Sequence, residues 1–210
     1  MEKLSRKIAE AIGKNLGKTD EEVAVIAYGM TGIIQFSAIF LFSSIVGILF
    51  GFWIESAVVF LSVGFLRRLT GGAHSSGIYS CLIYSVLFVS GISALSVYVL
   101  PLLEWYVNVI LCGAVFLYGY VMVALKAPVS PPNKPCRTEA KRKRLRKGAF
   151  IVLTLFLITV ITFILCRDLC GRLYSVGIAL AISTIWQIVM MTRAGHAFVD
   201  FVDGLFSSRK

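Results

Sequence analysis

An uncharged stretch of more than thirty residues constrains this chain most. No Asp, Glu, Lys or Arg occurs from Val23 to Ile54, and most of these residues are aliphatic or aromatic. A helix rises about 1.5 Å per residue, so about 20 apolar residues cross a hydrocarbon core of about 30 Å. The whole chain is 58% hydrophobic and only 15% charged, unlike an ordinary soluble domain. The pattern predicts a membrane-spanning protein.

Further apolar segments follow, separated by short polar or basic ones. We predict spans near 31–52, 54–66, 78–100, 105–125, 149–166 and 173–192, of which the second is short. The expected fold class is therefore an all-α polytopic membrane protein with about six transmembrane helices. The whole of residues 1–210 is expected to form one domain.

The first 22 residues have a different pattern. Leu4, Ile8, Ile12 and Leu16 recur every four residues among charged ones, which predicts an amphipathic helix. Such a helix lies either on the membrane surface or against the protein's own cytoplasmic side. The Thr19 hydroxyl and the Glu22 carboxylate are spaced as a capping box, so a second helix is expected to start there.

Basic residues indicate the orientation. With both termini in the cytoplasm, every Lys and Arg except Arg167 and Arg172 lies on the cytoplasmic side, as the positive-inside rule favours. Many of them fall in a predicted basic loop, 126–148, which either serves topology and lipid contact or attracts an acidic peptide. The net charge of +10 does not indicate nucleic-acid binding, since the basic residues lie between apolar spans.

The polar segment after the second span contains the residues that could carry out catalysis. His74 and Cys81 lie seven residues apart there, and the chain contains only one other His. A cysteine nucleophile needs a base that later returns a proton to the leaving amine, and His suits that role. In one continuous helix the two would be about 10.5 Å apart along the axis, too far for contact.

The segment is therefore expected to bend at its glycines. We predict that the third span starts near Gly77, with Cys81 in about its first turn. The partial positive charge and free amides at a helix N-terminus favour a thiolate and can hold an oxyanion. Considered alone, either residue is also consistent with a plain structural role, Cys81 in packing and His74 at the surface.

The pattern Arg67-Arg68, Gly71-Gly72-Ala73-His74 and Cys81 resembles the signature of the accessory gene regulator protein B family. These are bacterial membrane peptidases that mature quorum-sensing peptides. Residues 120–147, in which Ala127-Pro128 precedes a Lys/Arg-rich run, resemble the family's central basic loop.

The resemblance implies that His74 and Cys81 are the catalytic pair, supported by Arg67 and Gly72, at the cytoplasmic face of a bacterial cell membrane. It also implies a short signal propeptide as substrate, cleaved through an acyl thioester and closed into a thiolactone or lactone ring. A homodimer is compatible with the family, and no metal or organic cofactor is expected. The basic loop would assist, and we name Lys141, Arg142, Lys143 and Arg144 as candidate substrate-binding residues.

Other interpretations remain open. A non-enzymatic membrane peptide exporter would tolerate Cys81→Ala, whereas a peptidase would not. His196 is a rival base, and Cys166 and Cys170 are candidates for oxidation, although four residues apart in a helix they would need distortion to form a disulfide. Cys112 is expected to pack inside the fourth span and Cys136 to be a loop thiol.

Overall fold

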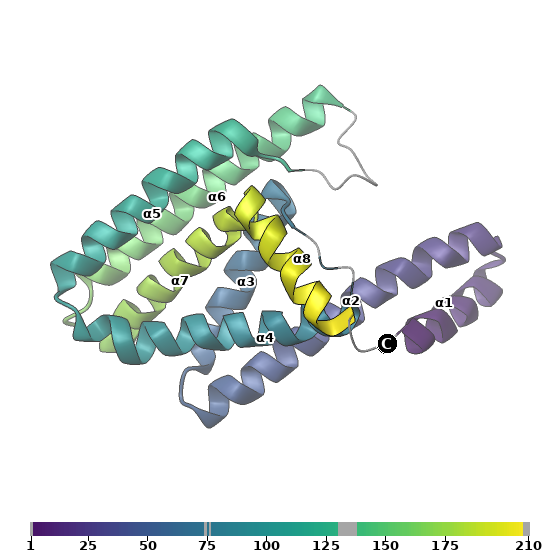
Figure 1. The fold of residues 1–210 in the computed structure, drawn as a ribbon, viewed down its shortest axis with the longest axis horizontal. Helices are drawn as coiled ribbons and strands as arrows, with labels where there is room; N and C mark the ends of the chain where they lie inside the picture. Colours follow the sequence, from purple (N-terminus) through teal and green to yellow (C-terminus); the bar gives the residue numbers. More distant parts are fainter. Residues whose placement is uncertain (1, 74, 76, 130–137, 208–210) are drawn as a thin grey trace.

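The computed structural model describes residues 2–73, 75, 77–129 and 138–207 (Figure 1). They form an all-α polytopic membrane fold, which confirms the predicted class. The helices are α1 (Glu2–Leu16), α2 (Asp20–Leu49), α3 (Trp53–Thr70), α4 (Ile78–Ala94), α5 (Trp105–Lys126), α6 (Glu139–Leu165), α7 (Gly171–Val189) and α8 (Arg193–Ser207). Two short irregular turns of helix, η1 (Leu95–Val99) and η2 (Leu100–Leu102), extend α4.

Within the described residues, five helices are long and apolar enough to cross a membrane: α2, α4 with its extension, α5, α6 and α7. Helix α3 has only 18 residues and includes three charged ones, Glu55, Arg67 and Arg68. It corresponds to the short second span expected near 54–66, but it continues through both arginines to Thr70.

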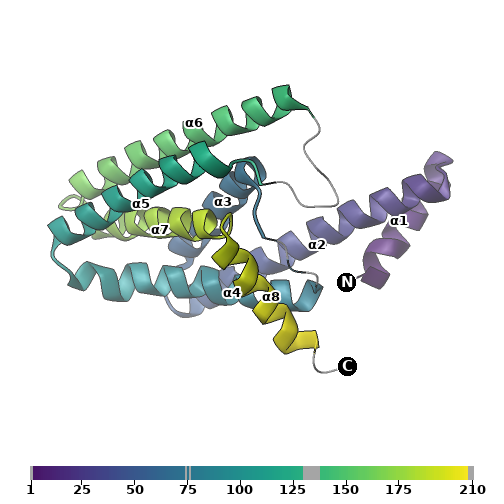
Figure 2. The same cartoon turned by 45° about the horizontal axis from the view of Figure 1, so that its top comes forward.

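Helix α7 lies at the centre of the bundle. It packs against α3, α5 and α6, and most of its residues are buried (Figures 1 and 2). Many of these are small, which lets helices approach closely inside a membrane. A Cβ added at Gly177 would lie 3.1 Å from the Cβ of Phe163 on α6. The core is therefore built around one helix of short side chains.

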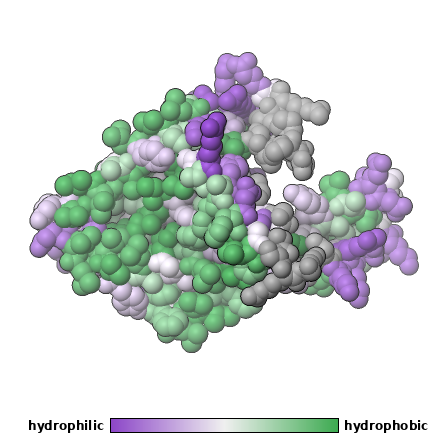
Figure 3. Space-filling model, viewed as in Figure 1, coloured by the Kyte–Doolittle hydropathy of each residue, from purple (hydrophilic) through white to green (hydrophobic). Residues whose placement is uncertain are grey.

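The outer faces of the bundle are hydrophobic. Figure 3 shows apolar surface over the middle of the molecule, with hydrophilic residues gathered at its extremities. Large side chains from several helices are exposed, among them Ile33, Leu87, Leu117 and Ile158. An exposed apolar surface of this extent is what a lipid-facing protein requires.

One end of the bundle is closed by a buried carboxylate. Glu55 is 1% exposed, accepts a hydrogen bond from Ser175 Oγ at 2.7 Å and pairs with Arg172 at 3.4 Å. Arg172 also donates to the carbonyl of Gly51 at 2.9 Å. A buried charge is tolerated only when paired and hydrogen-bonded, so these contacts join α3 to the start of α7. The loop after Thr70 lies at the other end of α3.

The N-terminal helix folds back on the protein. The predicted capping box is present, since Glu22 N–H donates to Thr19 Oγ1 and Thr19 N–H to the Glu22 carboxylate. Helix α1 lies along the first turns of α2: Ala9 is fully buried, and Ser5 Oγ and Thr31 Oγ1 are 2.7 Å apart. Helix α1 thus packs on the protein through small residues, whereas Leu4 and Leu16 of the predicted apolar stripe are exposed, which leaves part of the stripe available to a membrane surface.

The extent of the predicted basic loop was wrong. Helix α6 begins at Glu139 and includes residues 139–148, and Lys126 is the last residue of α5, so these parts of the predicted loop are helical. Lys and Arg are good helix formers, and Lys143 pairs with Glu139 one turn earlier at 3.0 Å. The tail after the last span, for which no helix was predicted, also forms a helix, α8.

Candidate active site

The segment that joins α3 to α4 depends on two glycines. Gly71 has φ of 70° and Gly72 has φ of 139°, values that L-residues with a Cβ rarely adopt. A Cβ at Gly71 would lie 1.9 Å from the carbonyl oxygen of Val129, and one at Gly72 would lie 3.1 Å from that of Met190. Gly72, predicted to support the site, thus lies where another residue would be strained.

Neighbouring elements hold this segment by its backbone. The Ala73 N–H donates to Met190 O at 2.9 Å, and the side chain of Gln187 donates to Gly71 O at 2.7 Å. On the other side, the Val129 N–H donates to Thr70 O at 2.8 Å. The end of α7 and the residues after α5 therefore fix the path of the chain towards His74.

Arg67 links the same segment to the candidate nucleophile. Its guanidinium donates to the carbonyl of Ala73, the residue before His74, and its side chain also lines a pocket together with Cys81. His74 itself lies outside the described residues, so the predicted His74/Cys81 pair is not tested. What the structure describes on either side is Ala73 and Ser75.

Cys81 occupies the predicted place in α4. The helix begins at Ile78 after the N-cap Gly77, so Cys81 is in its first turn. Its own N–H donates to Gly77 O at 3.0 Å, which leaves the amides before it as the donors suited to an oxyanion. Its sulfur lies 3.7 Å from Tyr84 Oη and is partly exposed.

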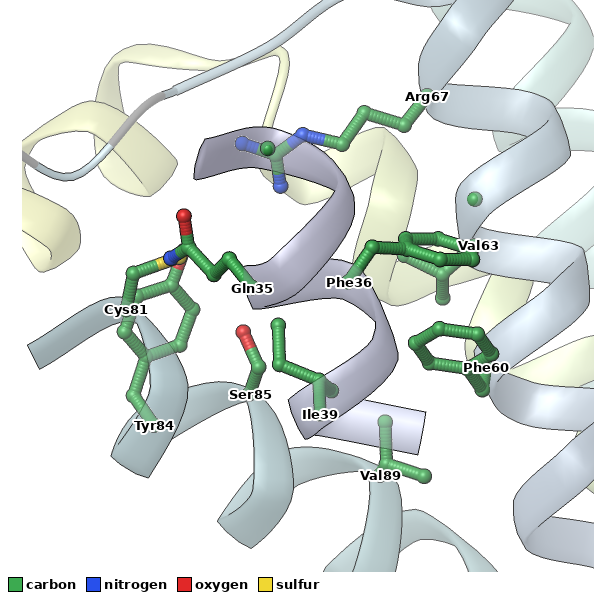
Figure 4. Close-up of a pocket in the computed structure, with 12 residues that line it drawn as sticks. Gln35, Phe36, Ile39, Phe60, Val63, Arg67, Cys81, Tyr84, Ser85 and Val89 are labelled. Atoms are coloured by element: carbon green, nitrogen blue, oxygen red, sulfur yellow. The ribbon is translucent and has the colours of Figure 1, made fainter. Parts of the chain in front are cut away.

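A pocket of about 220 Å³ opens between α2, α3 and α4 beside this thiol. Most of its wall is apolar, formed by Phe36, Ile39, Phe60, Val63 and Val89. Figure 4 shows Arg67 from α3 and Cys81 from α4 directed towards the space that these helices enclose. The arrangement suits an apolar group held next to a nucleophile, with one cation nearby.

Sequence reasoning missed several polar residues of this region. Gln35, whose side chain donates to Ile78 O at 3.5 Å, and Tyr84 line the pocket, while Gln187 binds the glycine segment. Tyr84 is three residues after Cys81 and so on the same helix face, which the sequence could have indicated. Gln35 and Gln187 are each an isolated amide in an apolar span, a weaker but visible signal.

The four predicted substrate-binding residues lie elsewhere. Lys141, Arg142, Lys143 and Arg144 are exposed in the first turns of α6 and are not among the residues that line the pocket. The nearby Arg146 instead has a structural contact, donating to Ala127 O at 2.9 Å. Any role of the four in binding would involve parts of a substrate outside the pocket.

The remaining singled-out residues have plain surroundings. Cys112 is buried in α5, as predicted, and Cys166 and Cys170 are free thiols, while Cys136 lies outside the described residues. His196 is exposed on α8, where its Nδ1 lies 2.8 Å from the carbonyl oxygen of Thr192. It does not line the pocket that contains Cys81.

Comparison with known families identifies one match over most of the chain. The family model described as accessory gene regulator B matches residues 5–191. The matched range includes the glycine segment, Cys81 and all the helices around the pocket.

Curated relatives carry the same family name. A protein of Clostridium perfringens strain SM101 named as AgrB-like is 29% identical over 206 residues, which cover 97% of this chain and 96% of the relative. A protein of Halalkalibacterium halodurans, also named as AgrB-like, is 29% identical over 161 residues, covering 75% of this chain and 76% of the relative. No solved structure matches the chain.

Proposed function

Because the chain belongs to the accessory gene regulator B family, which takes part in processing the regulator's peptide, we propose that it is a membrane cysteine endopeptidase. The substrate is a short signal propeptide, cut at one peptide bond. The cut piece is then closed into a thiolactone or lactone ring. Cys81 is the nucleophile and His74 the base.

The reaction has two acyl transfers. In the first, the Cys81 thiolate adds to the carbonyl carbon of the scissile bond, and protonated His74 gives its proton to the leaving amine as the C–N bond breaks. The C-terminal part of the propeptide leaves, and the rest remains as a thioester on Cys81. In the second, a Cys or Ser side chain of the substrate attacks that thioester, His74 takes its proton, and the Cys81 thiolate is released.

The observation that carries the proposal is the shared pocket of Cys81 and Arg67. It places a partly exposed thiol, in the first turn of a helix, beside an apolar cavity between three helices. An apolar wall limits water near the thioester, and ring closure competes with hydrolysis only where water is kept away. Arg67 also holds the backbone of the residue before His74.

The site is proposed to face the cytoplasm of a bacterial cell. Basic residues gather at the start of α6 and at the end of α3, the end of the bundle at which Cys81 lies. Their attraction to the cytoplasmic side sets the orientation. The exposed row Lys141 to Arg144 is proposed to attract the polar part of the propeptide from there.

Mass spectrometry after co-expression with the propeptide encoded nearest to this chain tests the proposal. Wild type is expected to give a shortened product whose mass is lower, by one water, than that of the linear fragment that hydrolysis at the same bond would give. Cys81→Ala and His74→Ala are expected to give neither. Cys170→Ala, a change at an exposed thiol far along the chain, is the matched control and is expected to process normally.

Normal processing by the Cys81→Ala variant would exclude Cys81 as the nucleophile. If that variant also released the mature peptide from cells as wild type does, the alternative of a non-enzymatic exporter would be favoured instead.

A further inference from the structure

The C-terminal helix α8 follows the family match, which ends at residue 191, yet it packs beside the candidate active site. Val199 is 1% exposed, and the ring of Phe198 meets those of Trp186 and Phe88 edge-on at 5.7 and 5.5 Å. These contacts hold α8 against α7 and α4, across which it runs in Figures 1 and 2. The helix therefore has a fixed place on the bundle.

One carboxylate of α8 reaches the chain around His74 and Cys81. Asp203 Oδ1 accepts hydrogen bonds from Ser80 Oγ at 2.7 Å and from Ser75 Oγ. Ser75 directly follows His74, and Ser80 directly precedes Cys81. Ser75 Oγ in turn accepts from the Gly77 N–H at 3.2 Å. A single side chain thus ties both ends of the segment that separates the two catalytic candidates.

The chemistry of the three groups makes Asp203 the organising one. Each serine hydroxyl has one proton, and the two hydroxyl oxygens are 2.8 Å apart, so either could instead bond the other or the Gly77 carbonyl. An ionised carboxylate only accepts, and hydrogen bonds to a charged acceptor are about twice as strong as neutral ones. The carboxylate therefore selects one arrangement of both serines. Its charge is also favourable in the first turn of α4.

From these contacts we propose that Asp203 is a positioning residue for the peptidase reaction. It fixes Ser75 and Ser80, the immediate neighbours of His74 and Cys81 in the chain, so that the two catalytic candidates keep the separation that proton transfer needs, without touching the substrate. The proposal rests on the proposed function of this pair. In this proposal α8 stabilises the site through Asp203, although it lies outside the part of the chain that the family model covers.

The positioning role of Asp203 is tested by steady-state kinetics of the purified protein in vesicles with the synthetic propeptide. Misplacing a catalytic group by about 1 Å costs up to about 100-fold in rate, so Asp203→Ala is expected to lower kcat by about 10- to 100-fold. KM is expected to change by less than about 2-fold, because binding contacts are retained. Asp203→Asn keeps the size of the side chain and one acceptor oxygen, so its kcat is expected to lie between those of wild type and Asp203→Ala. Asp200→Ala, an exposed carboxylate one turn earlier on α8, is the matched control.

A mutant cycle separates positioning from a loss of folding. Ser75→Ala with Ser80→Ala is expected to lower kcat as much as Asp203→Ala, and adding Asp203→Ala to that pair is expected to lower it no further. The proposal would be overturned if the decreases in kcat caused by the serine substitutions and by Asp203→Ala multiplied in the combined variant. It would also be overturned if Asp203→Asn and Asp203→Ala both had the kcat of Asp200→Ala.

A measurement without propeptide distinguishes this proposal from the proposed function. In a variant whose other four cysteines are Ala, the rate of Cys81 alkylation by iodoacetamide is expected to fall about 10-fold with Asp203→Ala, because iodoacetamide reacts with the thiolate form of cysteine, which a neighbouring His favours. An unchanged alkylation rate would overturn the positioning role. If Asp203→Ala slowed alkylation but wild type cut no propeptide, the role of Asp203 in positioning Cys81 would stand and the proposed peptidase function would be rejected.

Discussion

At the scale of single residues, the candidate site depends on a backbone conformation available to glycine. We predict that Gly72→Ala reduces propeptide processing by about 10-fold or more, since a left-handed conformation costs an L-residue about 1–2 kcal/mol. The added Cβ would also lie 3.1 Å from Met190 O, against the end of α7 that holds Ala73. Either response, a shift of the segment or of α7, moves the chain that carries His74. The measurement is product formation at equal membrane content of the variants.

Gly91→Ala provides the control for that substitution. Gly91 is inside α4, and a Cβ there would meet nothing within 4 Å, so Ala is expected to leave activity unchanged. In a helix, Ala is favoured over Gly by about 1 kcal/mol. Equal activity of the Gly72→Ala and Gly91→Ala variants would show that the conformation of Gly72 is not needed.

The features of the site that depend on local structure could be predicted from the sequence, whereas the contacts between residues far apart in the chain could not. Gly77 as a helix start and Cys81 in the first turn follow from local signals, and both are confirmed. The contact of Gln187 with Gly71 joins residues 116 positions apart, and that of Asp203 with Ser80 joins residues 123 apart. No spacing rule relates such positions, because the packing of whole helices decides which of them meet.

At the scale of elements, the start of α6 presents a row of exposed cations. If this row attracts the propeptide, changing Lys141, Arg142, Lys143 and Arg144 together to Gln is expected to raise KM several-fold and leave kcat unchanged. Attraction between exposed charges is screened over about 8–10 Å at ordinary salt, so the difference from wild type is expected to shrink as salt is raised. The measurement is kcat and KM at low and high salt.

Helix α1 supplies a control with the same loss of charge. Lys3, Arg6, Lys7 and Lys14 are also exposed, so their change to Gln removes four positive charges from another element. An equal rise in KM in this variant would mean that net charge, and not the α6 row, attracts the substrate. A fall in kcat in the α6 variant would contradict a role limited to attraction.

The elements themselves were predictable wherever hydrophobicity changes sharply along the chain. The apolar runs located the spanning helices, and the polar Thr19–Glu22 motif located the start of α2. The helical character of 139–148 was missed because its many charges suggest a loop, although Lys, Arg and Glu all favour helices. Charge is therefore a poor guide to a loop where the charged residues themselves favour a helix.

At the scale of the whole molecule, the arrangement of the helices was not predictable from their hydrophobicity. All five candidate spans are apolar; the lowest mean hydropathy, 1.4 against 2.0 to 2.7 for the others, sets the central helix α7 apart from those that face lipid but does not say which helices it contacts. The difference lies in composition, since α7 contains Gly177, Ala179, Ala181 and Ser183 where neighbours approach. With α7 in the centre, its end contacts the Gly71–Ala73 segment, and the polar residues of the site come together.

The orientation of the whole bundle is the last property to test. Helices α6 and α7 place the exposed Cys170 at the end of the bundle opposite the start of α6, where Lys143 has an exposed side chain. In a background without other cysteines, a membrane-impermeant maleimide is expected to label Cys170 on intact cells. Lys143→Cys, with Cys170 also replaced, is expected to react only after the membrane is permeabilised, because the positive-inside rule keeps this basic end in the cytoplasm.

The reverse pattern would place Cys81 outside the cell, where a cytoplasmic propeptide does not reach it. Labelling of both sites on intact cells would mean that the protein inserts in two orientations.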